Sequence, residues 1–422
     1  MRTYPRQKLY DVGHGQFFSA WSSGRLNDGN DGDFTNAFAR FMETDRDVIA
    51  LSRGRLGVYF AVKAAVREGR RKVLLSPFTI FDLINMVIVA GGEPVFLDSA
   101  PDSPHIPLAH VKTALGDDVA ALIITHYHTS NPEIAKIAAA ASKAGVMLIE
   151  DCAISVGGRP GGKPVGLHGD VGVFSFGLFK FIATYFGGAM VVKDPALAAS
   201  VREQMAGWPQ MTGADLKSYL IKGLKLDTLT QPLLFSLLTF PAFRWGYLND
   251  IAWVKKQAVN DPEPVLRSEL PEMFKRRPSD FQQREWARQL PKVLENRERR
   301  LANARAYRAG LEGSNAIVIP PAPDDVADCF LNFPVLVDER DAVLKGLMAR
   351  GFDASQYYYR NCAELEVFRA YHRDLPNIGA FVNRLLVLPA YPAVPEEYAK
   401  ALAAALREIA AEGTASHRGA SA

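Results

Sequence analysis

The sequence predicts an α/β protein in which a large, mostly parallel sheet domain is followed by a smaller α+β C-terminal domain. Two observations predict this fold class. Between about 47 and 194, short apolar runs alternate with helix-like stretches, and buried strands separated by helices are typical of a parallel sheet covered on both faces. The chain also has 422 residues, which is long for a single core and suits a large domain with a smaller one.

The alternation can be followed element by element. Strand-like runs occupy 48–51, 72–76, 94–98, 121–128 and 146–151, and helix-like stretches lie at 57–69, at 81–92 and before Gly145. Two further strand-like runs, 171–176 and 189–192, follow with no helix between them. Strands connected in this way can join the sheet out of sequential order.

The chain divides into four predicted parts. Residues 1–200 form the large domain, and 201–278 form an apolar and aromatic insertion of uncertain role. The third part, 279–412, begins with a long helix that ends near Leu311 and continues as the small C-terminal domain. Residues 413–422 are small and polar, so we expect them to form a disordered tail.

Composition and charge argue against several classes of protein. The formal net charge of +3 gives no indication of a nucleic-acid partner. Cys152, Cys329 and Cys362 form no CxxC pair, so we expect no metal site and no disulfide framework, and a reducing cytoplasm is the natural location. The N-terminus lacks the apolar stretch of a secretory signal. No apolar run reaches the roughly 18 residues needed to span a bilayer.

Three side chains with useful chemistry follow predicted strands. Asp151 ends one strand, Ser175 lies at the end of another, and Lys180 comes five residues later. The carboxyl edge of an open α/β sheet is where ligands bind. Taken singly, an Asp after a strand is usually a cap and a Lys is usually solvated. Together they supply the amine, carboxylate and hydroxyl that pyridoxal phosphate (PLP) needs for its aldehyde carbon, ring nitrogen and phosphate.

The segment around these residues resembles the DegT/StrS family of sugar aminotransferases, which are fold-type I PLP-dependent enzymes. The matching motifs are Asp151-Cys152-Ala153, Gly157-Gly158, Ser175-Phe176 with Lys180, and Gly187-Gly188. Further matches lie in 51–64, 76–98, 121–128, 279–297 and 385–392. The resemblance covers about 35–195 and 275–410, which is most of the chain outside the apolar insertion.

The resemblance implies a role for each matched residue. Lys180 would be the catalytic lysine, which forms a Schiff base with PLP and moves the proton. Asp151 would bind the pyridinium nitrogen, while Ser175 and the turn at Gly54 would bind the phosphate. His126 matches a family histidine near the cofactor, and a hydrogen-bonded structural histidine is an equally good interpretation.

The implied reaction is transfer of an amino group from an amino acid, with glutamate as the first candidate, to a keto sugar. The sugar would be nucleotide- or carrier-linked and would serve polysaccharide or glycan precursor synthesis. The implied assembly is a homodimer. Two alternatives remain: another PLP-dependent reaction on a different substrate, or a degenerate PLP fold that acts as a scaffold at a membrane surface.

Several residues depart from the family pattern close to the cofactor. Arg55 replaces the usual Thr, and it would either contact the phosphate or substrate or point away and leave the backbone to bind. Ile80 stands where the aromatic residue that stacks on the ring is usual, so either Phe81 takes over the stacking or Ile80 covers the ring. Ile154 replaces a Gln and cannot donate a hydrogen bond.

Two phenylalanines and a basic segment complete the departures. Phe181 follows the lysine in place of a polar residue, and Phe186 replaces the acid before the glycine pair. In 275–279, Lys275 takes the place of an Asn and Arg277 keeps the family Arg. This segment would reach across the dimer and bind a phosphate or an anionic substrate, or it is a solvated basic loop.

The apolar stretch from Leu226 to Tyr247 matches no feature of the family. It would line a substrate entrance, pack in the dimer interface, or lie in a membrane surface. Its flanking cations, which suit an anionic surface, are Lys222, Lys225, Arg244, Lys255 and Lys256. Ordinary packing on the core or the dimer is the favoured interpretation, and peripheral membrane contact is the alternative.

Overall fold

The computed structural model describes residues 2–9, 11–254, 263–322, 328–357 and 359–420. Its centre is a seven-stranded sheet with the order β1-β8-β7-β6-β5-β2-β4. The strands are β1 (Asp47–Leu51), β2 (Lys72–Leu75), β4 (Glu93–Phe96), β5 (Val119–Thr125), β6 (Met147–Asp151), β7 (Val171–Ser175) and β8 (Gly188–Val192). Strands β4, β2, β5, β6 and β7 are parallel, while β8 runs antiparallel to both β7 and β1.

The predicted α/β fold class is confirmed. β7 and β8 follow one another in the chain without a helix, and β8 lies between β7 and β1 in the sheet. The expectation that these strands join out of sequential order is therefore also correct. Because β6 and β7 are parallel, Asp151 and Ser175 lie at the same edge of the sheet, where both strands end.

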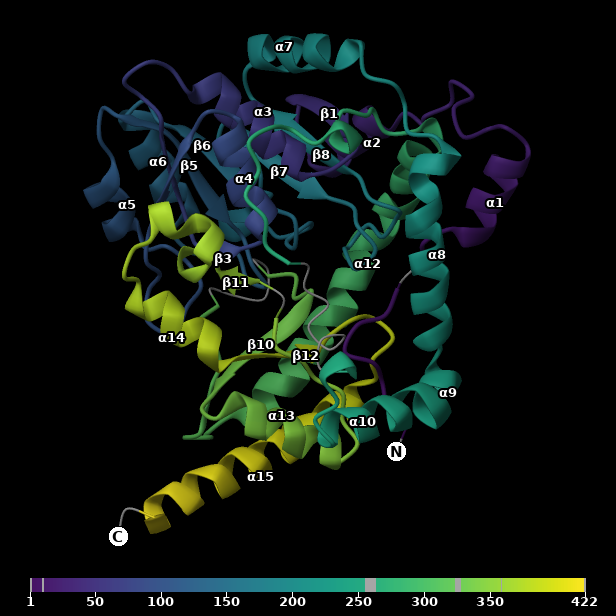
Figure 1. Ribbon diagram of the computed structural model, residues 1–422, viewed down its shortest axis with the longest axis vertical. Coiled ribbons are helices and arrows are strands. Elements are labelled where there is room, and N and C mark those ends of the chain that lie inside the picture. The colour runs from purple at the N-terminus through teal and green to yellow at the C-terminus, as the bar shows by residue number, and fades with distance from the viewer. Residues whose placement is uncertain (1, 10, 255–262, 323–327, 358, 421–422) are drawn as a thin grey trace.

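Helices cover both faces of the sheet, as Figure 1 shows for the upper part of the molecule. Apolar strand residues alternate between the faces: Ile49 and Leu51 pack with one core, and Val48 packs with the other. One face contacts α3 (Arg55–Ala65), α4 (Phe81–Val89) and α7 (Pro195–Ala206). The opposite face contacts α2 (Phe34–Phe41), α5 (Leu108–Ala114), α6 (Ile134–Lys143) and α12 (Asp280–Leu311).

Helix α12 links the large domain to the small one (Figure 1). It begins with a capping box in which the side chains of Ser279 and Gln282 each bond to the other residue's backbone N–H. Its C-terminal half packs on the small domain. That domain contains β9 (Ile317–Val318), β10 (Asn332–Val337), α13 (Arg340–Ala349), α14 (Pro376–Arg384), β12 (Leu385–Pro389) and α15 (Glu396–Ala420).

Two details of the C-terminal third bear on the site and on the chain end. Strand β11 (Arg360–Asn361) pairs with β3 (Phe78–Thr79) of the large domain, which brings segment 359–365 against the sheet edge. Helix α15 runs to Ala420, so the structure has helix where we expect a disordered tail from 413. No proline interrupts that stretch, and the preceding helix can propagate through it.

The apolar insertion folds as a bent run of helices. These are α8 (Gly213–Leu229), α9 (Pro232–Leu234), the π-helical turn η2 (Phe235–Thr239) and α10 (Phe240–Leu248). In Figure 1, α8 descends from the large domain to α9 and α10 beside the small domain. α8 packs on α1 (His14–Ser22), and Phe235 and Phe240 pack on Met348 of α13. Among the described residues, no helix is long and apolar enough to cross a membrane.

Candidate active site

Asp151 is the buried acid of the sheet edge. It ends β6, only 4% of it is exposed, and its Oδ1 accepts a hydrogen bond of 3.1 Å from the backbone N–H of Ala153. Burial raises the pKa of the carboxyl above its ordinary value, and the positive charge of Lys180 acts in the opposite direction. The structure therefore brings Asp151 and Lys180 into one electrostatic environment, in which a cation stabilises the carboxylate.

Lys180 lies in the loop between β7 and β8, and side chains of α12 hold the end of that loop. Gln289 bonds to both the N–H and the carbonyl of Ala183, and Trp286 donates a bond of 2.8 Å to the Thr184 hydroxyl. Gln282 donates to the carbonyl of Phe186 at 2.9 Å. These three side chains recur at helical spacing on one face of α12, so the helix fixes the loop that carries the lysine.

His128 is a second buried group at this end of the site, and it was not among the site residues predicted from the sequence. Burial and then the charge of Lys180 lower its pKa to about 3, so its ring is neutral at physiological pH. Its Nε2 has no hydrogen-bond partner among the residues that the structure describes, and its ring meets that of Tyr357 edge-on at 4.7 Å. We call Asp151, Lys180 and His128 the carboxylate end of the site.

His126 uses both ring nitrogens within the protein. Its Nε2 lies 2.9 Å from Oε2 of Glu150, and its Nδ1 accepts the N–H of Asn131 at 3.2 Å. Because Nδ1 accepts, the proton is on Nε2, which donates to Glu150. Glu150 also accepts two backbone N–H bonds, at 2.9 and 2.6 Å. This arrangement favours the structural interpretation of His126 over a direct contact with a ligand.

A metal ion does not fit the same buried cluster. His126, Glu150 and Cys152 have ligand atoms within 4.8 Å of one another, but the hydrogen bonds of His126 and Glu150 already use the atoms that would coordinate. Burial raises the pKa of the Cys152 thiol well above its ordinary value, and metals bind the thiolate rather than the thiol. The three residues therefore form a structural core beneath the site.

Gly54, Ser175 and Gly188 form a second feature, which we call the glycine cradle. Gly54 is the N-cap of α3. A Cβ on Gly54 would lie 2.6 Å from the carbonyl oxygen of Phe174 and 3.0 Å from Cβ of Ser175. A Cβ on Gly188 would lie 2.5 Å from Cα of Gly54. The helix N-terminus, the serine and the glycine pair thus meet through backbone contact, which suits a helix-end anion site.

The two arginines beside Gly54 have different partners. Arg55 forms an ion pair with Asp82, and Nε of Arg267 contacts the same carboxylate at 3.1 Å. This pairing favours the alternative in which Arg55 points away and the backbone forms the anion site. Arg53 instead is buried, and its Nη2 donates a bond of 2.9 Å to the hydroxyl of Tyr219. We missed Arg53 from sequence, although its place beside Gly54 was a signal.

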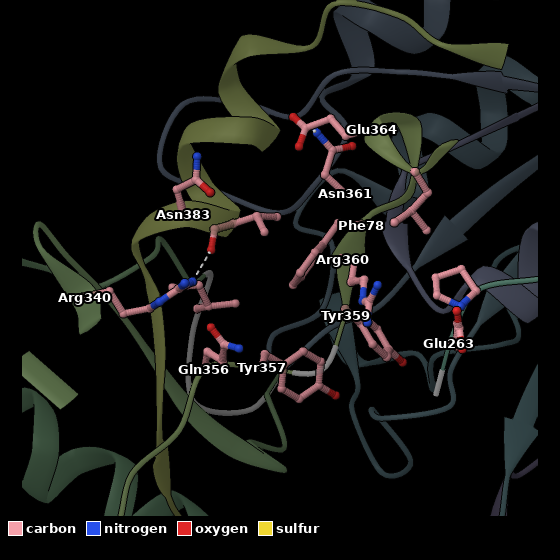
Figure 2. A pocket seen from close by; sticks show the side chains of 14 residues that line it. Phe78, Glu263, Arg340, Gln356, Tyr357, Tyr359, Arg360, Asn361, Glu364 and Asn383 are labelled. Atoms are coloured by element: carbon pink, nitrogen blue, oxygen red, sulfur yellow. Dashed lines mark hydrogen bonds between the residues drawn. The ribbon is translucent and has the colours of Figure 1, made fainter. Parts of the chain in front are cut away.

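A pocket of about 780 Å³ opens where the small domain meets the sheet edge. Figure 2 shows the aromatic rings of Phe78, Tyr357 and Tyr359 beside polar and charged side chains. The polar members of the lining are Glu263, Arg340, Gln356, Arg360, Asn361, Glu364 and Asn383. Because Tyr357 also meets the ring of His128, the pocket adjoins the carboxylate end of the site.

Comparison with known proteins decides the family. The model of the DegT/DnrJ/EryC1/StrS aminotransferase family matches residues 16–215 and 274–407. The chain belongs to this family. The resemblance noted from the sequence is therefore confirmed, as is the prediction of a transaminase, and residues 216–273 lie outside the family match.

Two curated relatives of the family align over most of the chain. A dTDP-4-dehydro-2,3,6-trideoxy-D-glucose 4-aminotransferase of Saccharopolyspora spinosa is 25% identical, covering 88% of this chain and 86% of the relative. A UDP-N-acetyl-3-dehydro-alpha-D-glucosamine 3-aminotransferase of Acidithiobacillus ferrooxidans is 24% identical, covering 85% and 83%. Among solved structures, the aminotransferase TlmJ of Streptoalloteichus hindustanus aligns with a TM-score of 0.72 and 20% identity over 98% and 100% of the chains.

The residues that depart from the DegT/DnrJ/EryC1/StrS pattern have packing partners. Phe181 lies under the guanidinium of Arg300 at 5.0 Å, and Phe186 lies under that of Arg53 at 4.7 Å. Ile154 is fully buried in the core that contains Phe181. Aromatic rings attract cations, so each phenylalanine here pairs with an arginine of another segment.

The candidate ring-stacking residues lie next to each other at the start of α4. Phe81 is buried in the core beneath α3 and α4, whereas Ile80 is half-buried and packs against both cores of the sheet. The structure thus places Ile80 between the cores and Phe81 within one of them. Which of the two covers the ring stays a prediction.

Lys275 follows the short helix η3 (Glu272–Phe274) and is half-exposed. Its Nζ pairs with Glu272 of the same chain at 2.5 Å, and this contact raises the pKa of the lysine. Phe274, directly before it, packs under Arg53 and Arg55 at 4.9 and 5.8 Å. The basic segment therefore begins close to the glycine cradle of its own chain, and its reach across a dimer stays a prediction.

Proposed function

We propose that this protein is a PLP-dependent aminotransferase that moves an amino group from an amino acid to a keto sugar. The observation that carries the proposal is the buried Asp151 beside Lys180, with a glycine cradle at the same edge of the sheet. These residues fit PLP because they offer an acid, an amine and an anion site. When bound, PLP supplies an electron sink that stabilises negative charge on the substrate carbon.

Each residue of the site has one task in this proposal. Asp151 holds the protonated ring nitrogen, and the desolvation of its carboxyl is relieved when that cation arrives. Lys180 anchors the cofactor and moves the proton between substrate carbon and cofactor. Gly54 and Ser175 bind the phosphate, with the N-terminal N–H groups of α3 adding partial positive charge.

The acceptor fits the pocket beside His128. Its volume of about 780 Å³ lies within the range of small-molecule sites, and its lining mixes tyrosines with amides and charged groups, which suits a hydroxyl-rich ring. The two curated relatives are named for keto sugars linked to dTDP and UDP. We therefore propose a nucleotide- or carrier-linked keto sugar as the acceptor and glutamate as the first donor to test.

Absorbance measurements on purified protein test the cofactor and the reaction. With excess PLP, the wild-type protein should show a near-visible band that glutamate removes and a keto sugar restores, with ping-pong kinetics. Lys180→Ala should lose the band and at least about 1000-fold of the activity. The matched control is Lys163→Ala, because Lys163 is exposed and should keep both. A wild-type protein without the band would refute the proposal.

Donor and acceptor screens separate the alternatives. A band that no amino acid removes would favour the scaffold, and a band that amino acids remove but no keto sugar restores would favour another PLP reaction. Cys152, Cys329 and Cys362 are all buried and none is joined in a disulfide, which supports a reducing cytoplasm as the location.

We also propose that the active form is a homodimer with Lys275 and Arg277 near the partner's site. The side chains of Val265, Leu266 and Met273, close in sequence to this segment, are exposed in the single chain, and a dimer would cover them. Sedimentation analysis should give about twice the mass of 46.4 kDa. A monomer that is fully active would contradict this assembly.

Peripheral membrane contact has specific support from the apolar insertion. Leu233, Leu237, Leu238, Trp245 and Trp253 are each between 64% and 70% exposed, whereas Phe235 and Phe240 of the same segment are buried. Lys222 and Lys225 are exposed on α8, while Lys255 and Lys256 lie outside the described residues. We propose that this surface contacts an anionic bilayer through aliphatic and Trp side chains.

Liposome flotation tests the membrane contact. The wild-type protein should float with anionic vesicles and less with neutral ones, and Leu237→Ser combined with Leu238→Ser should abolish flotation. Leu294→Ser is the matched control, because Leu294 is also exposed, at 51%, but lies on α12. Wild-type protein that stays at the bottom with anionic vesicles would refute the contact.

A further inference from the structure

Arg53 is a buried cation without a carboxylate partner among the described residues. Only 4% of the residue is exposed, its Nη2 bonds to the neutral hydroxyl of Tyr219 at 2.9 Å, and its Nε has no hydrogen-bond partner. Buried charges in proteins are normally paired, and a donor of a charged group is rarely left without an acceptor. Within the described part of the chain, no anionic group therefore balances the charge of Arg53.

Three aromatic rings surround the guanidinium but do not neutralise it. The rings of Phe186, Phe274 and Tyr219 lie 4.7, 4.9 and 5.4 Å from its central carbon. Cation–π contacts stabilise and orient a guanidinium, yet they leave its net charge in place. They also exclude water, which strengthens the attraction for any anion that does enter.

A second positive feature lies beside Arg53. Helix α3 begins two residues later, spans 11 residues, and has no acidic side chain in its first turn. The N–H groups of Leu56 and Gly57 bond to the carbonyls of Arg53 and Gly54, and the positive end of the helix dipole lies at this turn. The nearby carboxylate of Asp82 is already paired with Arg55 of the first turn. It therefore does not neutralise Arg53. A buried cation and a helix N-terminus repel each other unless a negative group lies between them.

We propose that Arg53 and the N-terminus of α3 together bind a phosphate dianion. The phosphate belongs either to PLP or to a nucleotide-linked substrate. Its assignment to PLP rests on the function proposed above, whereas the binding of inorganic phosphate at this site does not. Tyr219 is the positioning residue, because its hydroxyl holds Nη2 of Arg53. It comes from α8, in the stretch 216–273 that the family model does not match. The insertion thus adds Tyr219, and through it a fixed Arg53, to the phosphate turn that the family resemblance already places at Gly54.

Ligand titrations of cofactor-free protein test this assignment, with inorganic phosphate, PLP, UDP and pyridoxal as probes. Pyridoxal lacks the phosphate and reports on the rest of the site. Arg53→Gln should weaken the binding of inorganic phosphate, and of either PLP or UDP, by about 10- to 100-fold. It should leave the affinity for pyridoxal unchanged, because hydrogen bonds to charged groups contribute most of the recognition of a phosphate. Tyr219→Phe should weaken the same probes by about 3- to 10-fold.

The pattern of losses identifies the source of the phosphate. Weaker binding of PLP with unchanged binding of UDP would assign Arg53 to the phosphate of the cofactor. Weaker binding of UDP with unchanged binding of PLP would assign it to the phosphate of the substrate. Arg159→Gln, which removes a partly exposed arginine paired with Glu43, is the control and should change the affinity for neither PLP nor UDP. Unchanged binding of phosphate, PLP and UDP in Arg53→Gln would overturn the proposal.

Two further measurements keep the test decisive. Should Arg53→Gln not fold, judged by circular dichroism and melting, Arg53→Lys and Tyr219→Phe take its place, and unchanged affinities in both would refute the site. A wild-type protein that binds phosphate through Arg53 but binds no PLP would refute the proposed function and leave the anion site standing.

Discussion

The carboxylate end and the glycine cradle of the site are held together in different ways. At the carboxylate end the link is electrostatic: the charge of the half-buried Lys180 acts on the buried side chains of Asp151 and His128. At the cradle, backbone meets backbone, since Gly54 and Gly188 leave no room for a side-chain carbon between them. The carboxylate end therefore depends on the charges of its side chains, and the glycine cradle depends on the close packing of its backbone.

The difference teaches where each kind of substitution should act. Exchanging an acid for its amide at the carboxylate end keeps the shape and removes the charge that the reaction needs. Adding one methyl group at the cradle keeps all charges and forces the backbone apart. Activity and stability should therefore separate between the two ends.

The largest effect is expected for Asp151→Asn. The amide keeps the volume of the side chain but cannot stabilise a positive ring nitrogen, so turnover should fall on the order of a thousand-fold, as for loss of a preorganised electrostatic group. PLP should still bind through Lys180 and the cradle. Steady-state rates with titration of bound PLP measure this, and Asp45→Asn, which changes an exposed acid, is the control. A fully active Asp151→Asn protein would refute the assigned role.

The same variant should behave in the opposite way in folding. Burial raises the folded-state pKa of Asp151 above the ordinary 3.8, so ionisation costs stability as the pH rises from the unfolded value through the folded one. Without cofactor, Asp151→Asn should therefore be at least as stable as wild type at pH 8, with the difference vanishing near pH 4. Urea unfolding at pH 8 and at pH 4 measures this difference. A variant that is less stable than wild type at pH 8 would contradict the prediction.

A methyl group at the cradle should cost stability and cofactor binding together. In Gly188→Ala the new Cβ would lie 2.4 Å from the carbonyl oxygen of Phe174 and 2.5 Å from Cα of Gly54, both backbone atoms. Overpacking of this kind costs about 3 kcal/mol. Urea unfolding and PLP titration measure the two effects. Gly207→Ala, which meets no atom within 4 Å, should leave both unchanged.

The contrast also explains how much the sequence could predict. The strand that ends in Asp151, the loop that carries Lys180 and the turn at Gly54 are set by local pattern, and the family resemblance located all three. The packing of α8 against α1 and the lysine loop depends on contacts between distant segments, and no periodicity in the insertion indicates them. The insertion was therefore recognised from sequence only as apolar.

The two arginines beside Gly54 show the same limit on prediction from sequence, within a segment of four residues. Ser52-Arg53-Gly54-Arg55 does not reveal which guanidinium has a carboxylate partner, because Asp82 is 27 residues further along the chain. The tyrosine that bonds to Arg53 is 166 residues away. Arg55 was the residue predicted from the sequence to contact the anion. The structure instead pairs Arg55 with Asp82, and none of the acids it describes pairs with Arg53.

Two neutral histidines near the carboxylate end should make stability depend on pH. Burial is the main reason that His105 and His128 each have a pKa of about 3 in the folded state, against 6.5 ordinarily. The unfolded chain therefore binds more protons between pH 3 and 6.5, so each histidine should lower the free energy of unfolding at pH 5 by about 2 kcal/mol relative to pH 7.5.

Variants at these histidines measure how much each one contributes to the change of the free energy of unfolding with pH. His128→Asn should remove about 2 kcal/mol of the stability difference between pH 7.5 and pH 5, and His105→Asn a similar amount. His110→Asn is the control, since His110 is only partly buried. Equal pH slopes for wild type and His128→Asn would contradict the neutral, buried state of His128.

The smallest effect is expected for Arg55→Gln, and it is the sharpest comparison with Arg53. Arg55 is partly exposed, and its partner Asp82 keeps a second cation, Arg267, so the loss of one ion pair should cost less than about 1 kcal/mol of stability. If the backbone alone forms the phosphate contact at this turn, PLP affinity should change by less than about three-fold. A loss in Arg55→Gln as large as that in Arg53→Gln would mean that the ion pair with Asp82 breaks when PLP binds. The anion site would then include both arginines.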